Sequence, residues 1–385
     1  MFSDRVTSTS LPPLVELGEL ATETPGTISL GQGVPFYVPP WYIWEEFYGL
    51  LRYPEIHRYA PDQGRPSFRK ELSMKLKSEN TIPAEPEEII VTPGANLAYY
   101  IAVSTLADPG DKIGLISPYY FNHEMACTLL NVKPVEIPLT EDLELRAELI
   151  EEVVADPRTK AVTLVNPSNP TGKVFEISEI KMIRDLVEDY EKWLICDETY
   201  EYFVYEGDPH ISGGSILGLV ERTITIGSLS KSYGIPGWRV GYLHAPGDFA
   251  KEAIKVQDTT AITAPTPSQV LGELLLKERK TLIEEFFEYM KQNYEIAKKR
   301  LEDVPWLIPT PARGAYYLFP KIAKDISYSN GFEFAKKLIL EAGVYVVPGE
   351  AFGRAGRGHL RLSFGNTRPK ELNEAFDRLA SYSPM

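Results

Sequence analysis

The sequence is poor in cysteine and lacks any long apolar run. Its 385 residues include two cysteines, Cys127 and Cys196, which excludes a disulfide-rich scaffold. No apolar stretch approaches the roughly 20 residues that a membrane-spanning helix requires. Residues 1–10 are mostly polar and include an acid, unlike a secretory signal. We therefore expect a cytoplasmic protein without a membrane partner.

Positive charge is also scarce. The chain has 40 lysines and arginines against 54 acids, which gives a net charge of −14. This acidity argues against a nucleic-acid partner. Any anion that the protein binds must therefore be held by a small and specific group of residues.

Histidine is rare too, with five in the chain. His123 and Cys127 lie four residues apart and can share one face of a helix. A metal site needs more ligands than these two. We therefore predict no metal site.

Short apolar stretches alternate with amphipathic ones through the middle of the chain. Strands are expected at residues 88–92, 112–116, 160–165, 193–196, 223–226 and 240–244, with helices at 95–106 and 177–190. This alternation predicts an α/β fold, with a mixed, mostly parallel sheet between layers of helices.

The order changes after a long helical stretch at residues 269–301, which we expect to form one or two helices. Strands are expected at 315–319, 344–347 and 359–363, and helices at 332–342 and 369–380. This part is predicted to form a smaller α+β domain.

Polar and aromatic residues follow five of the expected strands. These segments are residues 93–96, 117–120, 166–172, 197–200 and 227–231. Ligands of open α/β sheets bind at the carboxyl ends of the strands. We therefore expect the five segments to form one site.

One group of these residues suits an anion. Gly94, Ala95 and Asn96 open a helix, whose free N–H groups and dipole attract negative charge. Ser228 adds a hydroxyl, and Arg239 adds a guanidinium that can bind through two N–H groups. The combination predicts a phosphate site.

A second group suits a flat ring that carries an aldehyde. Tyr120 can stack on such a ring, and Asp197 can pair with a protonated ring nitrogen. Asn169 and Tyr200 can donate to a phenolic oxygen, and Lys231 can form a Schiff base with the aldehyde. Together with the phosphate site, these features indicate pyridoxal 5′-phosphate.

Four motifs then give the chain a specific resemblance. They are Asn-Pro-x-Asn-Pro-Thr-Gly at 166–172, Asp-Glu-x-Tyr at 197–200, Ser-x-Ser-Lys…Gly-x-Arg-x-Gly at 228–241, and Arg-Leu-Ser-Phe at 361–364. In their order and spacing the chain resembles the fold type I, pyridoxal-phosphate-dependent aminotransferases of class I/II, of the aspartate and aromatic kind. The resemblance extends from about residue 28 to about residue 379.

The resemblance implies an architecture. It implies a seven-stranded, mostly parallel sheet in a large cofactor-binding domain at residues 41–290. Residues 1–40 and 291–385 would form a small domain, an N-terminal arm plus a C-terminal α+β part. It also implies a homodimer, in which Tyr59 reaches the cofactor phosphate in the neighbouring subunit.

The same resemblance implies roles for single residues. The catalytic residues would be Lys231, Asp197 and Tyr200. The cofactor would be bound by Ala95, Asn96, Tyr120, Asn169, Asp197, Tyr200, Ser228, Ser230, Lys231 and Arg239, with Tyr59 from the partner. Substrate would be bound by Gly33, Asn169 and Arg361, with the arginine on the α-carboxylate.

The implied activity is ping-pong transamination from an L-amino acid to a 2-oxo acid such as 2-oxoglutarate. Some relatives recognise a distal carboxylate with a lysine at the position of Asn96, whereas others bring an arginine from the partner subunit, for which the sequence gives no position. The aromatic segment 33–41 suits a neutral side chain, whereas Arg313, Arg354 or Arg357 can instead reach an acidic one. The donor is therefore expected to be aspartate, glutamate, an aromatic or another neutral amino acid.

Other interpretations stay open. A lyase on the same scaffold (a C–S β-lyase or a ring-closing synthase), an amine-oxidising enzyme and a non-catalytic regulator would share the cofactor residues. Arg361 can lie on the exposed face of a strand, and Tyr119 competes with Tyr120 for the stacking role. The Gly/Arg tract at 353–358 is expected to be a mobile loop near the substrate entrance.

Overall fold

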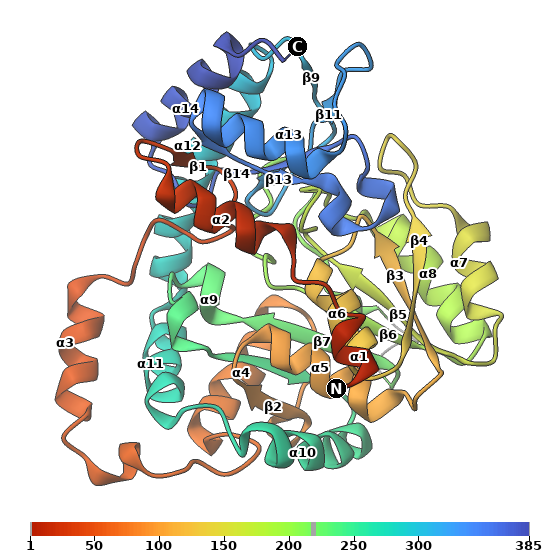
Figure 1. Cartoon of the computed structure of the whole chain (residues 1–385). Coiled ribbons are helices and arrows are strands. Elements are labelled where there is room, and N and C mark those ends of the chain that lie inside the picture. Colours follow the sequence, from red (N-terminus) through yellow and green to blue (C-terminus); the bar gives the residue numbers. More distant parts are fainter. Residues whose placement is uncertain (1, 217–220, 385) are drawn as a thin grey trace.

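A computed structural model describes residues 2–216 and 221–384. Its centre is a seven-stranded sheet in the order β2-β8-β7-β6-β5-β3-β4 (Figure 1). The strands are β2 (Ile89–Thr92), β3 (Lys112–Ser117), β4 (Lys133–Pro138), β5 (Thr159–Val165), β6 (Trp193–Asp197), β7 (Thr223–Ser228) and β8 (Gly241–His244). β8 runs antiparallel to β2 and β7, and all other neighbouring strands of this sheet are parallel to each other. The expected mixed, mostly parallel sheet is confirmed.

Helices cover both faces of the sheet because its strands are apolar on both sides. In β6, Ile195 packs in one buried cluster and Leu194 in another, as the two-residue period of a strand requires. The Ile195 cluster includes residues of α5 (Ala95–Leu106), α6 (Phe121–Leu129) and α10 (Gly247–Ala261). The Leu194 cluster includes residues of α7 (Ala147–Val154) and α8 (Ile177–Asp189).

The alternation of apolar and amphipathic segments did not predict β4. β4 contains two prolines, a lysine and a glutamate, and it pairs only with β3 at the edge of the sheet. An edge strand has one free side, so it tolerates proline and charge that a central strand does not.

The C-terminal part gathers in the upper region of Figure 1. Its helices are α12 (Arg279–Leu301), α13 (Gly331–Lys337) and α14 (Pro369–Ser381), and α11 (Thr266–Lys277) precedes them. Strands β10 (Tyr317–Leu318), β14 (Leu360–Ser363) and β13 (Val347–Pro348) form one small sheet. Two further pairs join β9 (Leu307–Ile308) to β11 (Lys321–Ile322) and β1 (Ile28–Ser29) to β12 (Val344–Tyr345).

This part differs from expectation in detail. Residues 344–347 form two short strands, β12 and β13, because the first pairs with β1 and the second with β14. Residues 269–301 lie in two helices, α11 and α12. The domain division at 290–291 stays a prediction, and this position lies inside α12.

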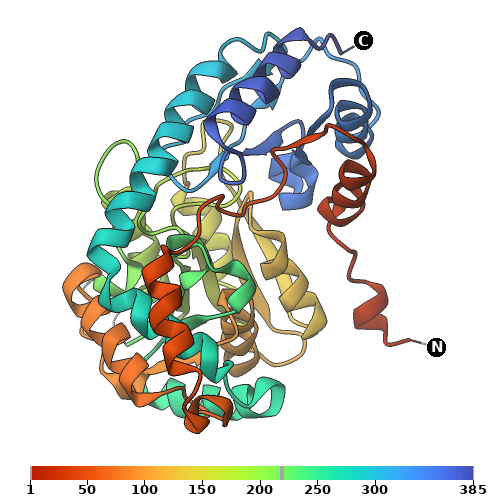
Figure 2. The same cartoon turned by 90° about the vertical axis from the view of Figure 1, so that its left-hand side faces the viewer.

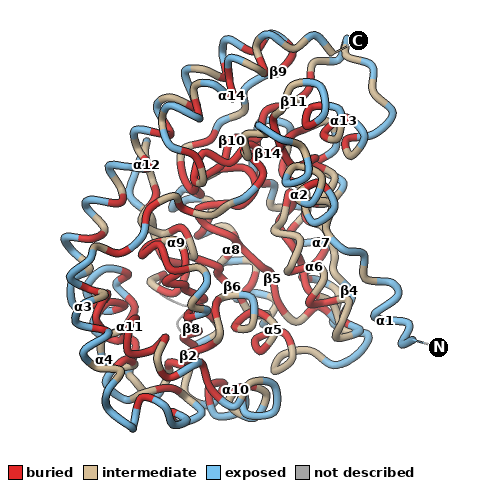
Figure 3. The backbone as a smooth tube through the Cα atoms, turned by 60° about the vertical axis from the view of Figure 1, so that its left-hand side comes forward, coloured by how far each residue is buried: buried red, intermediate tan, exposed pale blue. Residues whose placement is uncertain are grey.

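The N-terminal segment runs along the outside of the molecule, as Figure 2 shows. It contains α1 (Asp4–Thr7), which has no buried residue, and α2 (Pro13–Glu23). A hydrogen bond from Tyr345 Oη to the Leu14 carbonyl, at 2.9 Å, joins α2 to the C-terminal part. α3 (Trp41–Leu50) lies at the periphery, while α4 (Pro66–Glu79) buries one face, which includes Phe68, Leu72 and Leu76. Figure 3 shows the buried strands in the middle and α1 exposed. Among the described helices, none is long and apolar enough to cross a membrane.

Candidate active site

The carboxyl ends of the strands open into a cavity of about 430 Å³. Twelve of the thirteen predicted site residues line it: Gly33, Ala95, Asn96, Tyr120, Asn169, Asp197, Tyr200, Ser228, Ser230, Lys231, Arg239 and Arg361. Tyr59 lies outside it, with 80% of its surface exposed. Of the two competing tyrosines, Tyr120 lines the cavity and Tyr119 is not among the lining residues. The five strand-end segments therefore meet at one place.

Lys231 lies on the short helix α9 (Leu229–Ser232), which follows β7 directly. Ser228 caps this helix, because its Oγ accepts from Ser230 N at 3.1 Å. Lys231 Nζ donates to the Gly33 carbonyl at 2.6 Å. Burial, followed by the charges of Arg239 and Arg361, lowers the pKa of Lys231 to about 8. A substantial fraction of this amine is therefore neutral near pH 8.

Asp197 ends β6 and is held from two sides. Its Oδ1 accepts from Thr199 N at 3.1 Å, and its Oδ2 lies 3.2 Å from His123 Nε2. Burial alone would raise the pKa of Asp197, but the hydrogen bond and charge of His123, together with Thr199, leave it lowered. Asp197 is therefore a carboxylate that stays charged in a buried position.

His123 is a functional residue that the sequence pattern did not identify. The pattern placed it beside Cys127 as a possible ligand pair, and both residues do lie on α6. The His123 ring instead stacks on Tyr99 at 3.9 Å between centroids and turns Nε2 to Asp197. Cys127 is buried, with Sγ 3.8 Å from Tyr99 Oη.

One end of the cavity is built for an anion. Gly94 adopts φ 82° just before α5, and a Cβ at this position would collide with Arg239 Nη2. Arg239 itself adopts φ 51°, and its guanidinium donates to Pro236 O at 3.0 Å. The start of α5, the Ser228 hydroxyl and this guanidinium converge on the same cavity.

Arg361 marks the other end. It lies in β14 and is 3% exposed, so its placement on an exposed strand face is wrong. Nη1 donates to Asn169 Oδ1 at 2.9 Å, and Nη2 donates to Gly31 O at 2.6 Å. The rings of Tyr317 and Phe352 lie 4.6 Å and 4.9 Å from its Cζ. Its Nε is buried without a hydrogen-bond partner, and each Nη has a second N–H, so donors remain for a ligand.

Tyr317 is a second residue that the pattern missed. Its Oη lies 2.5 Å from Tyr200 Oη, and the two phenols face the cavity together. A Cβ at position 33 would collide with the Tyr317 hydroxyl, so Gly33 must be a glycine for this arrangement to exist.

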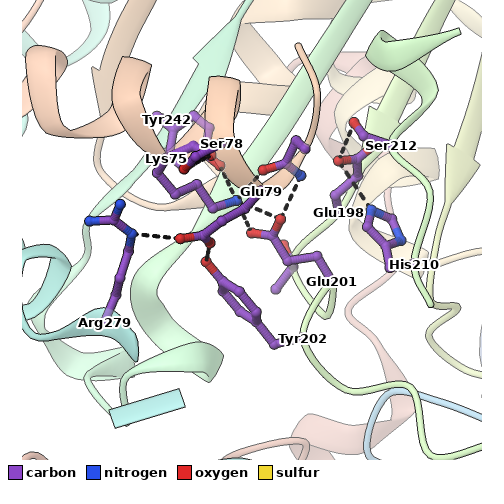
Figure 4. A network of polar contacts seen from close by, with 12 residues as sticks. Lys75, Ser78, Glu79, Glu198, Glu201, Tyr202, His210, Ser212, Tyr242 and Arg279 are labelled. Atoms are coloured by element: carbon purple, nitrogen blue, oxygen red, sulfur yellow. Dashed lines mark hydrogen bonds and ion pairs between the residues drawn. The ribbon is translucent and has the colours of Figure 1, made fainter. Parts of the chain in front are cut away.

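Buried polar contacts hold the loop that follows Asp197 and contains Tyr200 (Figure 4). Ser212 Oγ lies 2.7 Å from both carboxylate oxygens of Glu198, and Gly213 N donates to one of them at 2.9 Å. Lys75 of α4 donates to both oxygens of Glu201. Glu198 is thus tied to residues 212–213, and Glu201 is tied to α4.

Three possible metal ligands occur in this network. Single ligand atoms of Glu198, Glu201 and His210 lie within 4.8 Å of one another. The Lys75 ammonium, however, already pairs with Glu201 inside the fold. We therefore interpret the cluster as a brace for the loop.

The fold and the cavity define a class of protein. It is an α/β enzyme in which burial and two arginines of the same cavity lower the pKa of a lysine, and a buried carboxylate is kept charged by histidine. Such a site suits a cofactor and a substrate that both carry anionic groups.

The chain belongs to the family described as aminotransferase class I and II, whose profile matches residues 26–379. It is 34% identical to the aspartate aminotransferase of Pyrococcus abyssi over 382 residues, which cover 98% of this chain and 97% of the relative. It is also 34% identical to aromatic-amino-acid aminotransferase 2 of Thermococcus litoralis over 384 residues, with coverage of 98% and 97%.

Solved structures agree with this assignment. The aspartate aminotransferase of Thermus thermophilus with maleate is 28% identical and superimposes with a TM-score of 0.91 over 99% of each chain. The aromatic aminotransferase of Pyrococcus horikoshii is 32% identical, with a TM-score of 0.87 over 94% of this chain and 97% of that one. The protein is thus an aminotransferase with the fold type I architecture, as the motifs predicted.

Proposed function

We propose that this aminotransferase uses pyridoxal 5′-phosphate to move the α-amino group of an L-amino acid to a 2-oxo acid, with Lys231 as the central residue. The observation that carries the proposal is the buried Lys231 amine in the same cavity as Arg239 and Arg361, with a pKa lowered to about 8. A lysine of this kind is a nucleophile and a base at moderate pH.

The cavity residues fit the cofactor. The cradle made by Gly94 and Arg239 suits its phosphate, and Asp197 suits its ring nitrogen. Further contacts are assigned to Ala95, Asn96, Tyr120, Asn169, Tyr200, Ser228 and Ser230, which line the same cavity. When bound, the cofactor supplies an electron sink for the negative charge that develops at the substrate α-carbon.

Arg361 is proposed to bind the α-carboxylate of the substrate. Asn169 and Gly31 fix the plane of the guanidinium through Nη1 and Nη2. Nε is left free as a donor, which supports the presence of an anionic ligand at this end. A substrate held in this way presents its α-carbon to one amine in one orientation.

Lys231 is proposed to take the proton from the α-carbon and to return it in the reverse direction. The neutral amine accepts the proton at Nζ, which Gly33 O orients at 2.6 Å. Both half-reactions use the same cavity, so the first 2-oxo acid leaves before the second one enters.

A homodimer is part of the proposal. Tyr59 is 80% exposed, and α3 presents Trp41 and Tyr48, which are 73% and 66% exposed. Exposed aromatic residues of this kind suit a protein interface. We assign this face to a second copy of the chain, whose cavity would receive Tyr59. The two buried free cysteines support a reducing compartment such as the cytoplasm.

Borohydride reduction tests the central role of Lys231. The enzyme is loaded with pyridoxal phosphate, reduced and digested, and the labelled lysine is identified by mass spectrometry. We expect the label on Lys231. A label confined to another lysine would contradict the proposal.

A further inference from the structure

We propose that the enzyme prefers amino acids with uncharged, apolar side chains, and 2-oxo acids of the same kind, over dicarboxylic ones. The inference rests on the proposed function, because it takes Arg361 as the partner of the α-carboxylate. It concerns the part of the cavity beside Arg361, where the substrate side chain must then lie.

The Arg361 end of the cavity is distinct from the anion cradle. Arg361 donates to Gly31 O and Asn169 Oδ1, whereas Arg239 donates to Pro236 O. Residues 31–34 continue from Gly31 along the cavity wall. A substrate side chain that leaves an α-carbon near Arg361 therefore meets this loop and its neighbours.

Gln32 adds one uncharged polar side chain to this loop, and apolar side chains line the cavity beside it. The cavity is lined there by Leu14 and Val34. The Leu14 carbonyl accepts from Tyr345 Oη at 2.9 Å, and the Tyr345 ring lies so close to Gly31 that a Cβ there would collide with it. This contact places α2, and with it Leu14, beside the loop that bonds Arg361.

A third apolar residue of the cavity lining is Phe121. It lines the cavity and lies 5.9 Å from the Phe352 ring, measured between centroids. Phe352 in turn lies 4.9 Å below Arg361 Cζ. Leu14, Val34 and Phe121 thus approach the Arg361 end from three separate elements, and we name them the apolar wall.

The three arginines proposed for a distal carboxylate, Arg313, Arg354 and Arg357, are not among the residues that line the cavity, and two of them have partners elsewhere. Arg313 Nη2 donates to Val174 O at 3.0 Å and lies 3.3 Å from Glu176. The Arg354 side chain is exposed, and its Nε lies 3.7 Å from Glu136 Oε1, a carboxylate that also accepts from the Arg354 backbone N–H at 3.0 Å. The basic residues that line the cavity, among those described, are Lys231, Arg239 and Arg361.

The position beside the anion cradle is also occupied by a neutral group. Asn96 lines the cavity there with an uncharged amide, and Ala95 lies beside it. A second substrate carboxylate would therefore be buried against the apolar wall. Removing such a charge from water without a partner is strongly unfavourable, whereas an aromatic or aliphatic side chain gains by burial.

Half-reaction kinetics with the full-length, cofactor-loaded enzyme test this preference. The cofactor absorbance is followed after mixing with phenylalanine, leucine, alanine, aspartate or glutamate, and the reverse reaction is started with phenylpyruvate or 2-oxoglutarate. We expect the rate constant divided by Kd for phenylalanine and leucine to exceed that for aspartate and glutamate by about 100-fold. The same order is expected for the two 2-oxo acids.

Substitution of the apolar wall provides the second measurement. Leu14→Ala and Phe121→Leu should each lower the rate constant divided by Kd for phenylalanine by about tenfold. The same quantity for alanine should stay unchanged, because the methyl group of alanine is too short to reach the apolar wall. Val15→Ala is the matched control, because Val15 is the next residue of α2 and is exposed.

The possible results distinguish a failure of the apolar preference from a failure of the proposed function. Equal or faster reaction of aspartate or glutamate, or an unchanged phenylalanine-to-alanine ratio in both wall variants, overturns the apolar preference while leaving transamination intact. A protein that reacts with none of the five amino acids overturns the proposed function and this inference with it.

Discussion

The phenol oxygens of Tyr37 and Tyr316 lie 2.6 Å apart, and both contact the backbone carbonyl of Lys231. Tyr37 Oη is 2.6 Å from this carbonyl oxygen and Tyr316 Oη is 3.1 Å from it. Two hydroxyl hydrogens serve three contacts, so one phenol donates to the carbonyl while the other donates to its partner. The pair fixes the backbone of the residue that carries the reactive amine.

We expect Tyr37→Phe and Tyr316→Phe each to cost about 1 kcal/mol of the free energy of unfolding. Either single variant leaves one phenol to bond the carbonyl. The double variant leaves the carbonyl buried without this partner, so its cost should exceed the sum of the single costs. Urea denaturation of the cofactor-loaded enzyme measures all three, with Tyr42→Phe on the exposed face of α3 as the control. Simple additivity would show that the two phenols act independently.

Replacement of Arg361 by lysine should weaken amino-acid binding far more than cofactor binding. A lysine keeps the charge but loses the planar fork that Asn169 and Gly31 orient. We expect Kd for the amino acid to rise by about tenfold to 100-fold, with little change in the affinity for pyridoxal phosphate. Titration of both ligands measures the difference. An equal loss of the two affinities would mean that Arg361 is structural.

Replacement of His123 by phenylalanine should shift the acid limb of kcat/KM to higher pH. In the wild-type protein, His123 lowers the pKa of Asp197 against the effect of burial. The stabilisation from the Asp197 carboxylate is then present above its unfolded pKa and is lost as the pH falls through the folded pKa. Without His123, burial dominates and raises the pKa of Asp197, so the carboxylate becomes protonated at a higher pH.

A pH–rate profile from pH 5 to pH 9 and urea denaturation over the same range check this prediction. The exposed His57, replaced in the same way, is the matched control. An acid limb that stays in place in the His123 variant would exclude its effect on Asp197.

Subunit mixing tests the role of Tyr59 and the dimer together. Lys231→Ala should abolish turnover while still binding the cofactor, and Tyr59→Ala should lower activity through loss of a contact to the neighbouring cavity. A mixed dimer of the two variants contains one cavity with both native residues. We therefore expect mixing to restore activity, up to about half per mixed dimer.

Restoration requires that the subunits exchange, which a brief treatment with dilute urea can promote. Wild-type enzyme treated in the same way gives the reference activity. An unrestored mixture whose subunits have demonstrably exchanged would place Tyr59 outside the partner's cavity.

The sequence was most informative where the chemistry lies within a few residues. Lys231, Ser228 and Arg239 share one motif, and the strand before it identifies the edge of the sheet at which they lie. The alternation of apolar and amphipathic segments likewise predicted most strands of the central sheet. It failed for β4, because an edge strand need not be apolar.

Contacts across long distances in the chain escaped prediction for a physical reason. Tyr37 reaches Lys231 over 194 residues, and Lys75 reaches Glu201 over 126 residues. Neither spacing leaves a periodic signal, because such pairs are created only by the packing of separate elements. His123 is a related case, since it lies on α6 while its partner Asp197 lies at the end of β6.

Lys231 shares its cavity with two guanidinium groups, which makes its basicity responsive to what the cavity holds. Arg239 and Arg361 both disfavour the ammonium form. A phosphate against Arg239 would be a permanent counter-ion, whereas a carboxylate against Arg361 would arrive with each substrate and depart with each product. Neutralising Arg361 raises the proton affinity of the amine. The incoming amino acid would thereby strengthen the base that must deprotonate it, once in every half-cycle.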